Sequence, residues 1–134
     1  MKKSILAIDD SKAIRFLLQT VLGKDHQVVT APDGSSAMYW LSKTKIPDLI
    51  ITDPQMPDMK DWELIDELSS SILYRNIPIV VISSLDPELT KKKCEEYGVA
   101  AYFFKPFNPV ALLESVNDMT GRPKTWGRYI PSLS

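Results

Sequence analysis

The sequence that decides the fold is LIITDPQMP at residues 49–57. Residues 49–52 are apolar or β-branched without a polar alternation, which favours a strand covered on both faces, as in a parallel sheet. Pro54 and Pro57 then end regular structure. Asp53 is therefore expected at the carboxyl end of a buried strand, where open α/β sheets bind their ligands. Taken alone, the stretch fits equally well an aspartate that only satisfies backbone donors in a turn.

The rest of the chain repeats this alternation of a short apolar run and an amphipathic helix. Strands are expected at residues 5–8, 27–31, 49–52, 77–82 and 101–104. The first expected helix has Ser11 as its N-cap and Gly23 as its C′ residue. The second follows the turn at 32–34 and ends before Pro47. The third carries Leu64, Ile65, Leu68 and Ile72, the fourth runs from Asp86-Pro87 to Gly98, and the fifth starts at Asn108-Pro109. Alternating strands and helices predict a parallel sheet with right-handed crossovers.

Length and composition limit the class of protein. A chain of 134 residues suits one domain, which we place at residues 1–119, followed by a basic and aromatic tail at 120–134 that is too short for an output domain. The formal net charge of −1 gives no general attraction to nucleic acid or to an anionic membrane. The lone Cys94 excludes an internal disulfide, and no apolar run approaches the length of a spanning helix. We expect a soluble, cytoplasmic protein.

Polar residues follow four of the five expected strands, and these strand ends share one edge of a parallel sheet. They are Asp9, Asp10, Asp53, Ser83, Ser84 and Lys105. Clustered carboxylates repel one another, and Mg²⁺ with its oxygen ligands relieves that repulsion. A lysine and a serine beside the cation supply donors for a phosphoryl group. Because a carboxylate can itself form an aspartyl phosphate, the pattern predicts a Mg²⁺-assisted phosphoryl acceptor at Asp53.

The chain resembles the receiver domains of two-component response regulators over residues 4 to about 119. The resemblance rests on Asp9-Asp10 after the first strand, on Asp53 followed by Met56-Pro57, on Ser83, and on Lys105-Pro106-Phe107. Each motif is weak alone, but the ordered set is specific. The resemblance implies a flavodoxin-like, doubly wound α/β fold: a five-stranded parallel sheet in the order 2-1-3-4-5 with five helices. The general rule for this order already cites a receiver as its example.

The same resemblance implies a role for each residue of the set. Asp53 would accept a phosphoryl group from a sensor histidine kinase or a histidine phosphotransfer protein. Asp10, Asp53 and the carbonyl of Gln55 would bind Mg²⁺ directly, and Asp9 would complete the acidic pocket through water or the metal. Lys105 would pair with the phosphoryl group or with Asp53. Ser83 and the amide of Ser84 would contact the phosphoryl group, while Tyr102 would be the switch aromatic that follows Ser83. The Lys105–Pro106 bond would be cis.

Two positions depart from the pattern of the family. Lys60-Asp61 stands where an Asp-Gly pair is usual, and the missing glycine suggests a positive φ at Asp61. Pro54 removes one backbone donor directly after Asp53, so that the amide of Gln55 has to serve instead.

The leading functional interpretation is a stand-alone, phosphorylation-switched signalling module that acts on an unknown downstream protein and is not a turnover enzyme. The first alternative is a small Mg²⁺-dependent phosphohydrolase that uses an aspartyl phosphate. The second is a receiver-like interaction module that no longer accepts phosphate. Outside the acidic set, structural roles are expected for His26, Trp40 and Trp62, and a solvated face for Lys91 to Lys93.

Overall fold

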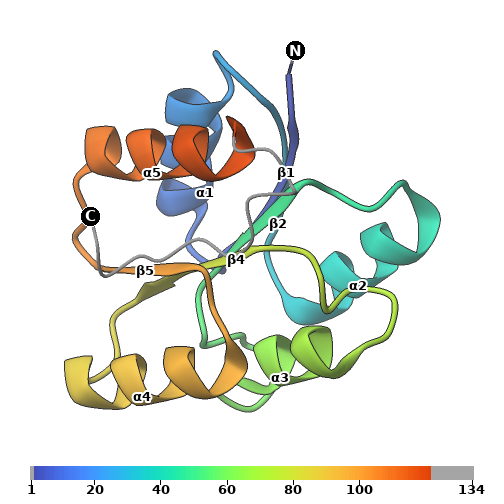
Figure 1. Cartoon of the computed structure of the whole chain (residues 1–134), viewed down its shortest axis with the longest axis vertical. Coiled ribbons are helices and arrows are strands. Elements are labelled where there is room, and N and C mark those ends of the chain that lie inside the picture. The colour runs from blue at the N-terminus through green and yellow to red at the C-terminus, as the bar shows by residue number, and fades with distance from the viewer. Residues whose placement is uncertain (1, 122–134) are drawn as a thin grey trace.

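The computed structural model describes residues 2–121, which form one sheet flanked by helices (Figure 1). The strands are β1 (Ser4–Ile8), β2 (Gln27–Ala31), β3 (Leu49–Thr52), β4 (Ile79–Ser83) and β5 (Ala101–Phe104). The helices are α1 (Lys12–Leu22), α2 (Gly34–Lys43), α3 (Glu63–Ser70), α4 (Pro87–Tyr97) and α5 (Pro109–Gly121). Strands and helices thus alternate along the chain as predicted.

All neighbouring strands pair in parallel, in the order β2-β1-β3-β4-β5. This confirms the predicted fold class and strand order. β3 lies at the centre of the sheet, and each of its residues is buried, as its unbroken apolar run indicated. The register pairs Ile8 with Thr52, so that β1 and β3 end side by side.

Successive side chains of the strands face two different hydrophobic layers. Ile50 belongs to the layer that includes Leu41 of α2, Leu68 of α3 and Cys94 of α4. Leu49 and Ile51 belong to the other layer, which contains Leu18 of α1 and Leu112 of α5. Figure 1 shows α1 and α5 together on one side of the sheet and α3 and α4 on the other. Because helices cover both faces of the sheet, polar side chains that could bind a ligand are expected at the ends of the strands.

Side-chain caps start the helices where the sequence predicted them. Ser11 accepts a hydrogen bond from the amide of Ile14 at 3.3 Å, and Asp86 accepts one from the amide of Leu89 at 3.0 Å. Such caps satisfy amides that have no partner within the helix. Gly98 follows α4 with φ +67°, a left-handed conformation that glycine adopts without a steric penalty.

Three local predictions were wrong. Gly23 follows α1, but as a right-handed C-cap with φ −68°, because a tight turn leads from Leu22 directly into β2. α3 ends at Ser70, since Ser71 is extended and its hydroxyl accepts from the amide of Leu73. Ile72 therefore lies beyond α3 and is 81% exposed. β4 begins at Ile79 rather than at residue 77, because Pro78 has no amide to donate to a ladder.

The residues expected to be structural are mostly buried. Trp62 is buried and Trp40 packs against the same hydrophobic layer. The imidazole of His26 is buried and its Nε2 lies 2.6 Å from Oδ1 of Asn117 in α5. α5 continues through Gly121, so Thr120 belongs to the helix rather than to the expected tail; residues 122–134 lie outside the described residues. Among residues 2–121, no helix is long and apolar enough to cross a membrane.

A pair of substitutions tests the corrected end of α3. Leu68 is fully buried, so Leu68→Ala leaves a cavity and should lower the free energy of unfolding by about 2–5 kcal/mol. Ile72→Ala removes an exposed side chain and should change it by less than about 0.5 kcal/mol. Urea denaturation of both variants measures the two values. A loss above about 2 kcal/mol in Ile72→Ala would place Ile72 in the core after all.

Candidate functional site

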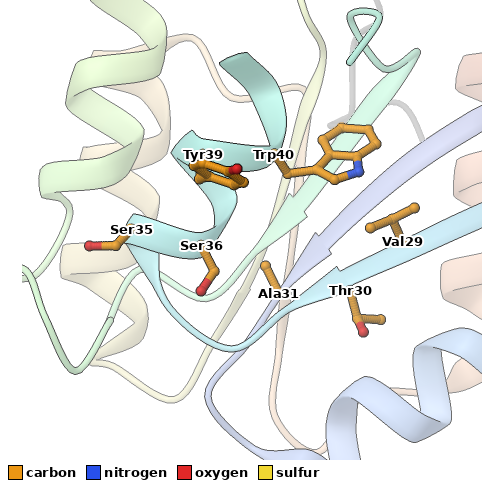
Figure 2. A pocket seen from close by; sticks show the side chains of 7 residues that line it. All are labelled: Val29, Thr30, Ala31, Ser35, Ser36, Tyr39 and Trp40. Atoms are coloured by element: carbon orange, nitrogen blue, oxygen red, sulfur yellow. The ribbon is translucent and has the colours of Figure 1, made fainter. Parts of the chain in front are cut away.

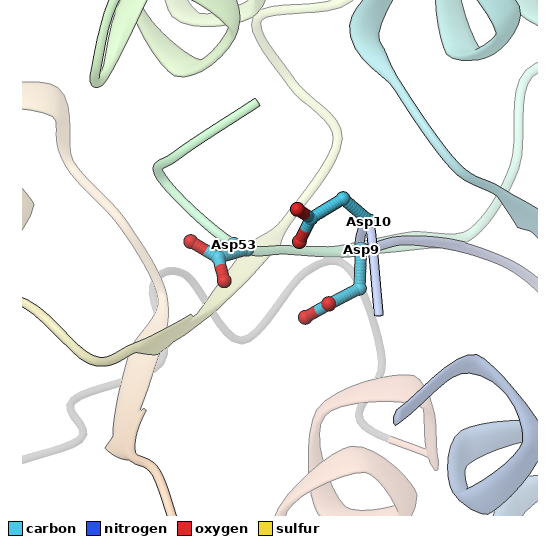
Figure 3. A group of neighbouring side chains, drawn as sticks. All are labelled: Asp9, Asp10 and Asp53. Atoms are coloured by element: carbon cyan, nitrogen blue, oxygen red, sulfur yellow. The ribbon is translucent and has the colours of Figure 1, made fainter. Parts of the chain in front are cut away.

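Three aspartates meet where β1 and β3 end. Oxygen atoms of Asp9, Asp10 and Asp53 all lie within 4.8 Å of one another. The amide of Asp53 donates to the carbonyl of Ile8 at 3.1 Å, which holds the two strand ends together. Asp9 and Asp53 are buried, whereas Asp10 is exposed. Figure 3 shows the three carboxylates gathered at this edge of the sheet.

Lys105 connects the two buried carboxylates. Its Nζ lies 2.8 Å from Oδ2 of Asp9 and 2.6 Å from Oδ2 of Asp53. Its amide donates to the carbonyl of Ser83 at 2.9 Å, which fixes the residue at the end of β5. The Lys105–Pro106 peptide bond that follows is cis, as the resemblance implied. Lys105 thus places one positive charge between two carboxylates that would otherwise repel each other.

Burial and hydrogen bonding both shift the pKa values of Asp53 and Lys105. Burial raises the pKa of Asp53 above its usual range, although the hydrogen bonds from Lys105 and from the amide of Gln55 act in the opposite direction. Burial alone would lower the pKa of Lys105, but its hydrogen bonds to Asp53 and Asp9 prevail and raise it. Lys105 is therefore protonated at neutral pH, and its single positive charge offsets part of the negative charge of its two partners.

Backbone donors fix the orientation of the buried carboxylates. Oδ1 of Asp53 accepts from the amide of Gln55 at 2.8 Å, the donor expected in place of the one that Pro54 lacks. Oδ1 of Asp9 accepts from the amide of Ser11 at 2.9 Å. Each of these two carboxylates thus has one oxygen on an amide and the other on Lys105. Asp10 shows no such fixation among the described hydrogen bonds and faces solvent.

Ser83 is buried at the end of β4 but makes no described hydrogen bond to Asp53. Its Oγ lies 3.0 Å from Oγ1 of Thr90, and it accepts from the amide of Leu85 at 2.9 Å. Ser84 is exposed. Tyr102 is half-buried, packs against the hydrophobic layer under α4, and meets the ring of Phe104 edge to face at 5.7 Å. The acidic residues and Lys105 are therefore already assembled, whereas Ser83 is turned toward α4.

The loop from Pro54 to Trp62 corrects the prediction for Asp61. The positive φ belongs to Trp62, at +69°, and the amide of Trp62 donates to the carbonyl of Pro54 at 2.8 Å. Burial of the indole and its stacking on Tyr97 of α4, at 6.4 Å between ring centres, favour this conformation despite its steric cost. The loop therefore closes on itself without a glycine at residue 61.

Further contacts, which the sequence did not predict, fix residues of the site and of the loops around it. Nη1 of Arg15 in α1 donates to the carbonyl of Asp9 at 2.8 Å. Asp58 accepts from the amides of Gly34 and Ser35 at 3.0 and 2.9 Å, and the Ser35 contact is the main reason that the pKa of Asp58 is lowered. Thr90 contacts Ser83 as described. No periodic pattern marks these residues, because each contact joins two different elements or loops and depends on how they pack.

A hollow between β2 and α2 contains none of the residues of the acidic cluster. It has a volume of about 540 Å³ and is lined by Val29, Thr30, Ala31, Ser35, Ser36, Tyr39 and Trp40. Figure 2 shows these residues on β2 and on α2. The lining carries no acidic or basic side chain and none of the predicted site residues. It adds nothing to the chemistry of the acidic cluster.

The sequence of residues 5–117 matches the family of the response regulator receiver domain. The chain belongs to this family. It is a domain of two-component signalling, and the residues that carried the resemblance lie within the matched range.

Relatives of similar length support the assignment of the receiver domain. A chemotaxis protein CheY homologue of Campylobacter jejuni is 31% identical over 120 residues, which cover 87% of this chain and 92% of that protein. The two-component response regulator ORR5 of Oryza sativa is 33% identical over 106 residues, which cover 78% and 79% of the two chains. The crystal structure of the chemotaxis regulator CheY4 of Vibrio cholerae superposes with a TM-score of 0.79 at 28% identity, covering 89% and 99%.

The receiver domain also matches a small part of much longer proteins. Histidine kinase P4 of Formosa agariphila is 33% identical over 107 residues, which make up 8% of that kinase. Two further histidine kinases are matched over 12% and 7% of their length. Similar receiver sequences thus occur both in short regulators and within kinases.

The acidic cluster of this receiver fits a divalent cation. Receiver domains bind Mg²⁺ at an acidic site, and the three carboxylates here offer oxygen ligands only, which suits a hard cation. Asp10 is exposed, so its carboxylate is open to an ion and its waters. Asp10, Asp53 and the carbonyl of Gln55 are the ligands that we predict.

Mg²⁺ should stabilise the receiver domain through Asp10. An ion that binds only the folded state adds roughly 1.4 kcal/mol at about ten times its dissociation constant. In thermal melting experiments, increasing Mg²⁺ should therefore raise the Tm of the wild type. It should raise the Tm of Asp10→Asn much less. Asp48→Asn, at the opposite end of β3, is the matched control and should respond like the wild type. An equal rise in Asp10→Asn would remove Asp10 from the ligand set.

Proposed function

We propose that Asp53 accepts a phosphoryl group from a phosphohistidine and that the receiver passes the signal on by protein–protein contact. The observation that carries this proposal is the position of Lys105, whose Nζ contacts both Asp53 and Asp9. Oxygen atoms of the three carboxylates lie within 4.8 Å of one another, and Lys105 contacts the two buried ones, Asp53 and Asp9. The donor would be a sensor histidine kinase or a histidine phosphotransfer protein.

The reaction is a transfer of one phosphoryl group between two nucleophiles. A carboxylate oxygen of Asp53 attacks phosphorus, the P–N bond to the donor imidazole breaks, and that imidazole keeps the electron pair and takes up a proton. Gln55 and Lys105 hold the two oxygens of Asp53 in fixed directions before the attack. Orientation of a reacting group in advance removes part of the barrier.

Charge on the transferring group is met by residues already in place. The ammonium of Lys105 lies beside Asp53 and can pair with a phosphoryl oxygen when the group arrives. Mg²⁺, held by Asp10, Asp53 and the carbonyl of Gln55, would neutralise further oxygens of the phosphoryl group. Asp9 keeps its contact with Lys105, which retains the ammonium at the site.

The geometry favours this function over a phosphohydrolase. A hydrolase that turns over needs a second acid to protonate the leaving group, and Asp9 is the nearest buried candidate. Both oxygens of Asp9 are occupied, Oδ1 by the amide of Ser11 and Oδ2 by Lys105. The hollow described at α2 and β2 is not lined by Asp53, Asp9 or Lys105. We therefore place the chain among signalling proteins rather than turnover enzymes.

The response to phosphorylation would begin at Ser83. The phosphoryl group offers strong acceptors, and Ser83, assisted by the amide of Ser84, would turn toward them. Tyr102 would then change its rotamer in the space that Ser83 leaves. Lys91 and Lys92 are exposed on α4 next to this region and are candidates for contact with the downstream protein. A phosphorylation-insensitive interaction module would not require this assembled set of Asp53, Lys105 and Asp9.

Phosphorylation at Asp53 is tested by intact mass spectrometry. Incubation with acetyl phosphate and Mg²⁺ should add one phosphoryl group to the wild type, because Asp53 is the only carboxylate held by both Lys105 and the Gln55 amide. Asp53→Asn should stay unmodified, since an amide oxygen is a far weaker nucleophile. Asp48→Asn is the matched control and should be labelled like the wild type.

Two results would contradict the assignment. Equal labelling of Asp53→Asn would move the acceptor elsewhere. Continuous release of phosphate at many turnovers per protein, without accumulation of a labelled species, would favour the phosphohydrolase.

A further inference from the structure

The hydroxyl of Ser83 has a specific partner in α4. Oγ of Ser83 and Oγ1 of Thr90 are 3.0 Å apart, and both residues are fully buried. Thr90 lies at the start of α4, where its amide donates to the carbonyl of Asp86. The pair therefore links the end of β4 to α4 at the point where Ser83 would have to move.

The hydrogen bonds of Ser83 show which contact is lost when its side chain moves. Ser83 accepts from the amide of Leu85, and its Oγ shares a hydrogen bond with Oγ1 of Thr90 in which either hydroxyl can be the donor. If Ser83 donates, its single proton cannot serve Thr90 and a phosphoryl oxygen at once. If Thr90 donates, a Ser83 that turns toward a phosphoryl oxygen moves its own oxygen away from Thr90. Because both residues are fully buried, solvent compensates less for the loss of such a bond than it would at the surface.

Thr90 has no contact with the acidic residues themselves. The described partners of the Asp53 carboxylate are Lys105 and the amide of Gln55, and those of the Asp9 carboxylate are Lys105 and the amide of Ser11. Any influence of Thr90 on phosphoryl binding therefore passes through Ser83. The two states of Ser83, bonded to Thr90 or bonded to the phosphoryl group, compete for one hydroxyl.

We infer that Thr90 is a positioning residue that holds Ser83 away from Asp53 and so sets how readily the site closes on a phosphoryl group. This inference rests on the proposed function of Asp53 and adds to it a residue that determines the strength of the response. A ligand shifts a two-state equilibrium by its differential affinity, and the Thr90 contact stabilises the state that the phosphoryl group does not bind. Removal of the Thr90 contact therefore lowers the free energy that opposes the movement of Ser83 toward Asp53.

The test is the affinity of the Mg²⁺-loaded protein for beryllofluoride, a phosphoryl mimic, in Thr90→Val and Thr90→Ser. Valine keeps the shape of threonine but lacks the hydroxyl, so Thr90→Val should bind beryllofluoride more tightly, by roughly two- to tenfold, the range of one hydrogen bond. Thr90→Ser retains a hydroxyl at the same position and should bind like the wild type. If Thr90→Val folds poorly, Thr90→Ala supplies the same loss of the hydroxyl.

A double-mutant cycle with Ser83→Ala separates the positioning role from a merely structural one. Without the hydroxyl of Ser83, Thr90→Val should leave the affinity for beryllofluoride unchanged. A structural role would lower the Tm of Thr90→Val and leave its affinity equal to or weaker than that of the wild type, which would overturn the inference. Tighter binding that persists in the Ser83→Ala background would also overturn it, because the coupling would then not pass through Ser83.

Failure of the proposed function gives a different result. A wild type that binds no beryllofluoride in the presence of Mg²⁺, and takes no label from acetyl phosphate, would remove Asp53 as acceptor. A wild type that binds and is labelled, with Thr90→Val indistinguishable from it, would remove only the role of Thr90.

Discussion

The ammonium of Lys105 between the carboxylates of Asp9 and Asp53 is the contact on which the site depends. Two buried carboxylates at the ends of neighbouring strands repel each other, and the cost of burying both is high without a counter-charge. Lys105 supplies that charge from β5, which the strand order separates from β3 by β4. Its side chain therefore extends past the end of β4, where Ser83 is located. A single lysine thus contacts Asp53 and Asp9 through its ammonium and the carbonyl of Ser83 through its amide.

The register of the sheet is the condition for this contact. Ile8 lies opposite Thr52, so the residues that follow them, Asp9 and Asp53, leave the sheet at the same height. A shift of β3 by one residue would exchange its two faces and place Ile50 in the layer of α1 and α5. The apolar side chains on both faces of β3 thus specify the register, and the register in turn places the carboxylates. The same apolar side chains therefore stabilise the core and fix the positions of Asp9 and Asp53.

The surroundings of Asp53 divide into fixed and movable parts. The loop after β3 is held by Trp62, whose ring stacks on Tyr97, and by Asp58, which accepts from two amides at the start of α2. Ser83 is held by hydrogen bonds to one hydroxyl and one amide, without a charged partner. Neutral hydrogen bonds are weaker than charge-assisted ones, so the connection from β4 to α4 is easier to rearrange than the pairing around Lys105. A site that binds a phosphoryl group and changes conformation in response needs both fixed and movable contacts.

The sequence by itself determined the alternation of strands and helices, the burial of residues 49–52 on both faces, and the six polar residues at the strand ends. Those features are local: apolar periodicity, caps such as Asp86, and turn residues act within a few positions of the chain. The resemblance added the strand order and the roles of Ser83 and Tyr102. Only the tertiary structure decided that Lys105 bridges Asp9 and Asp53, that Trp62 rather than Asp61 has the positive φ, that α3 ends before Ile72, and that Ser83 is paired with Thr90. Each of these depends on a contact between elements or on the exact end of an element, which apolar periodicity does not specify.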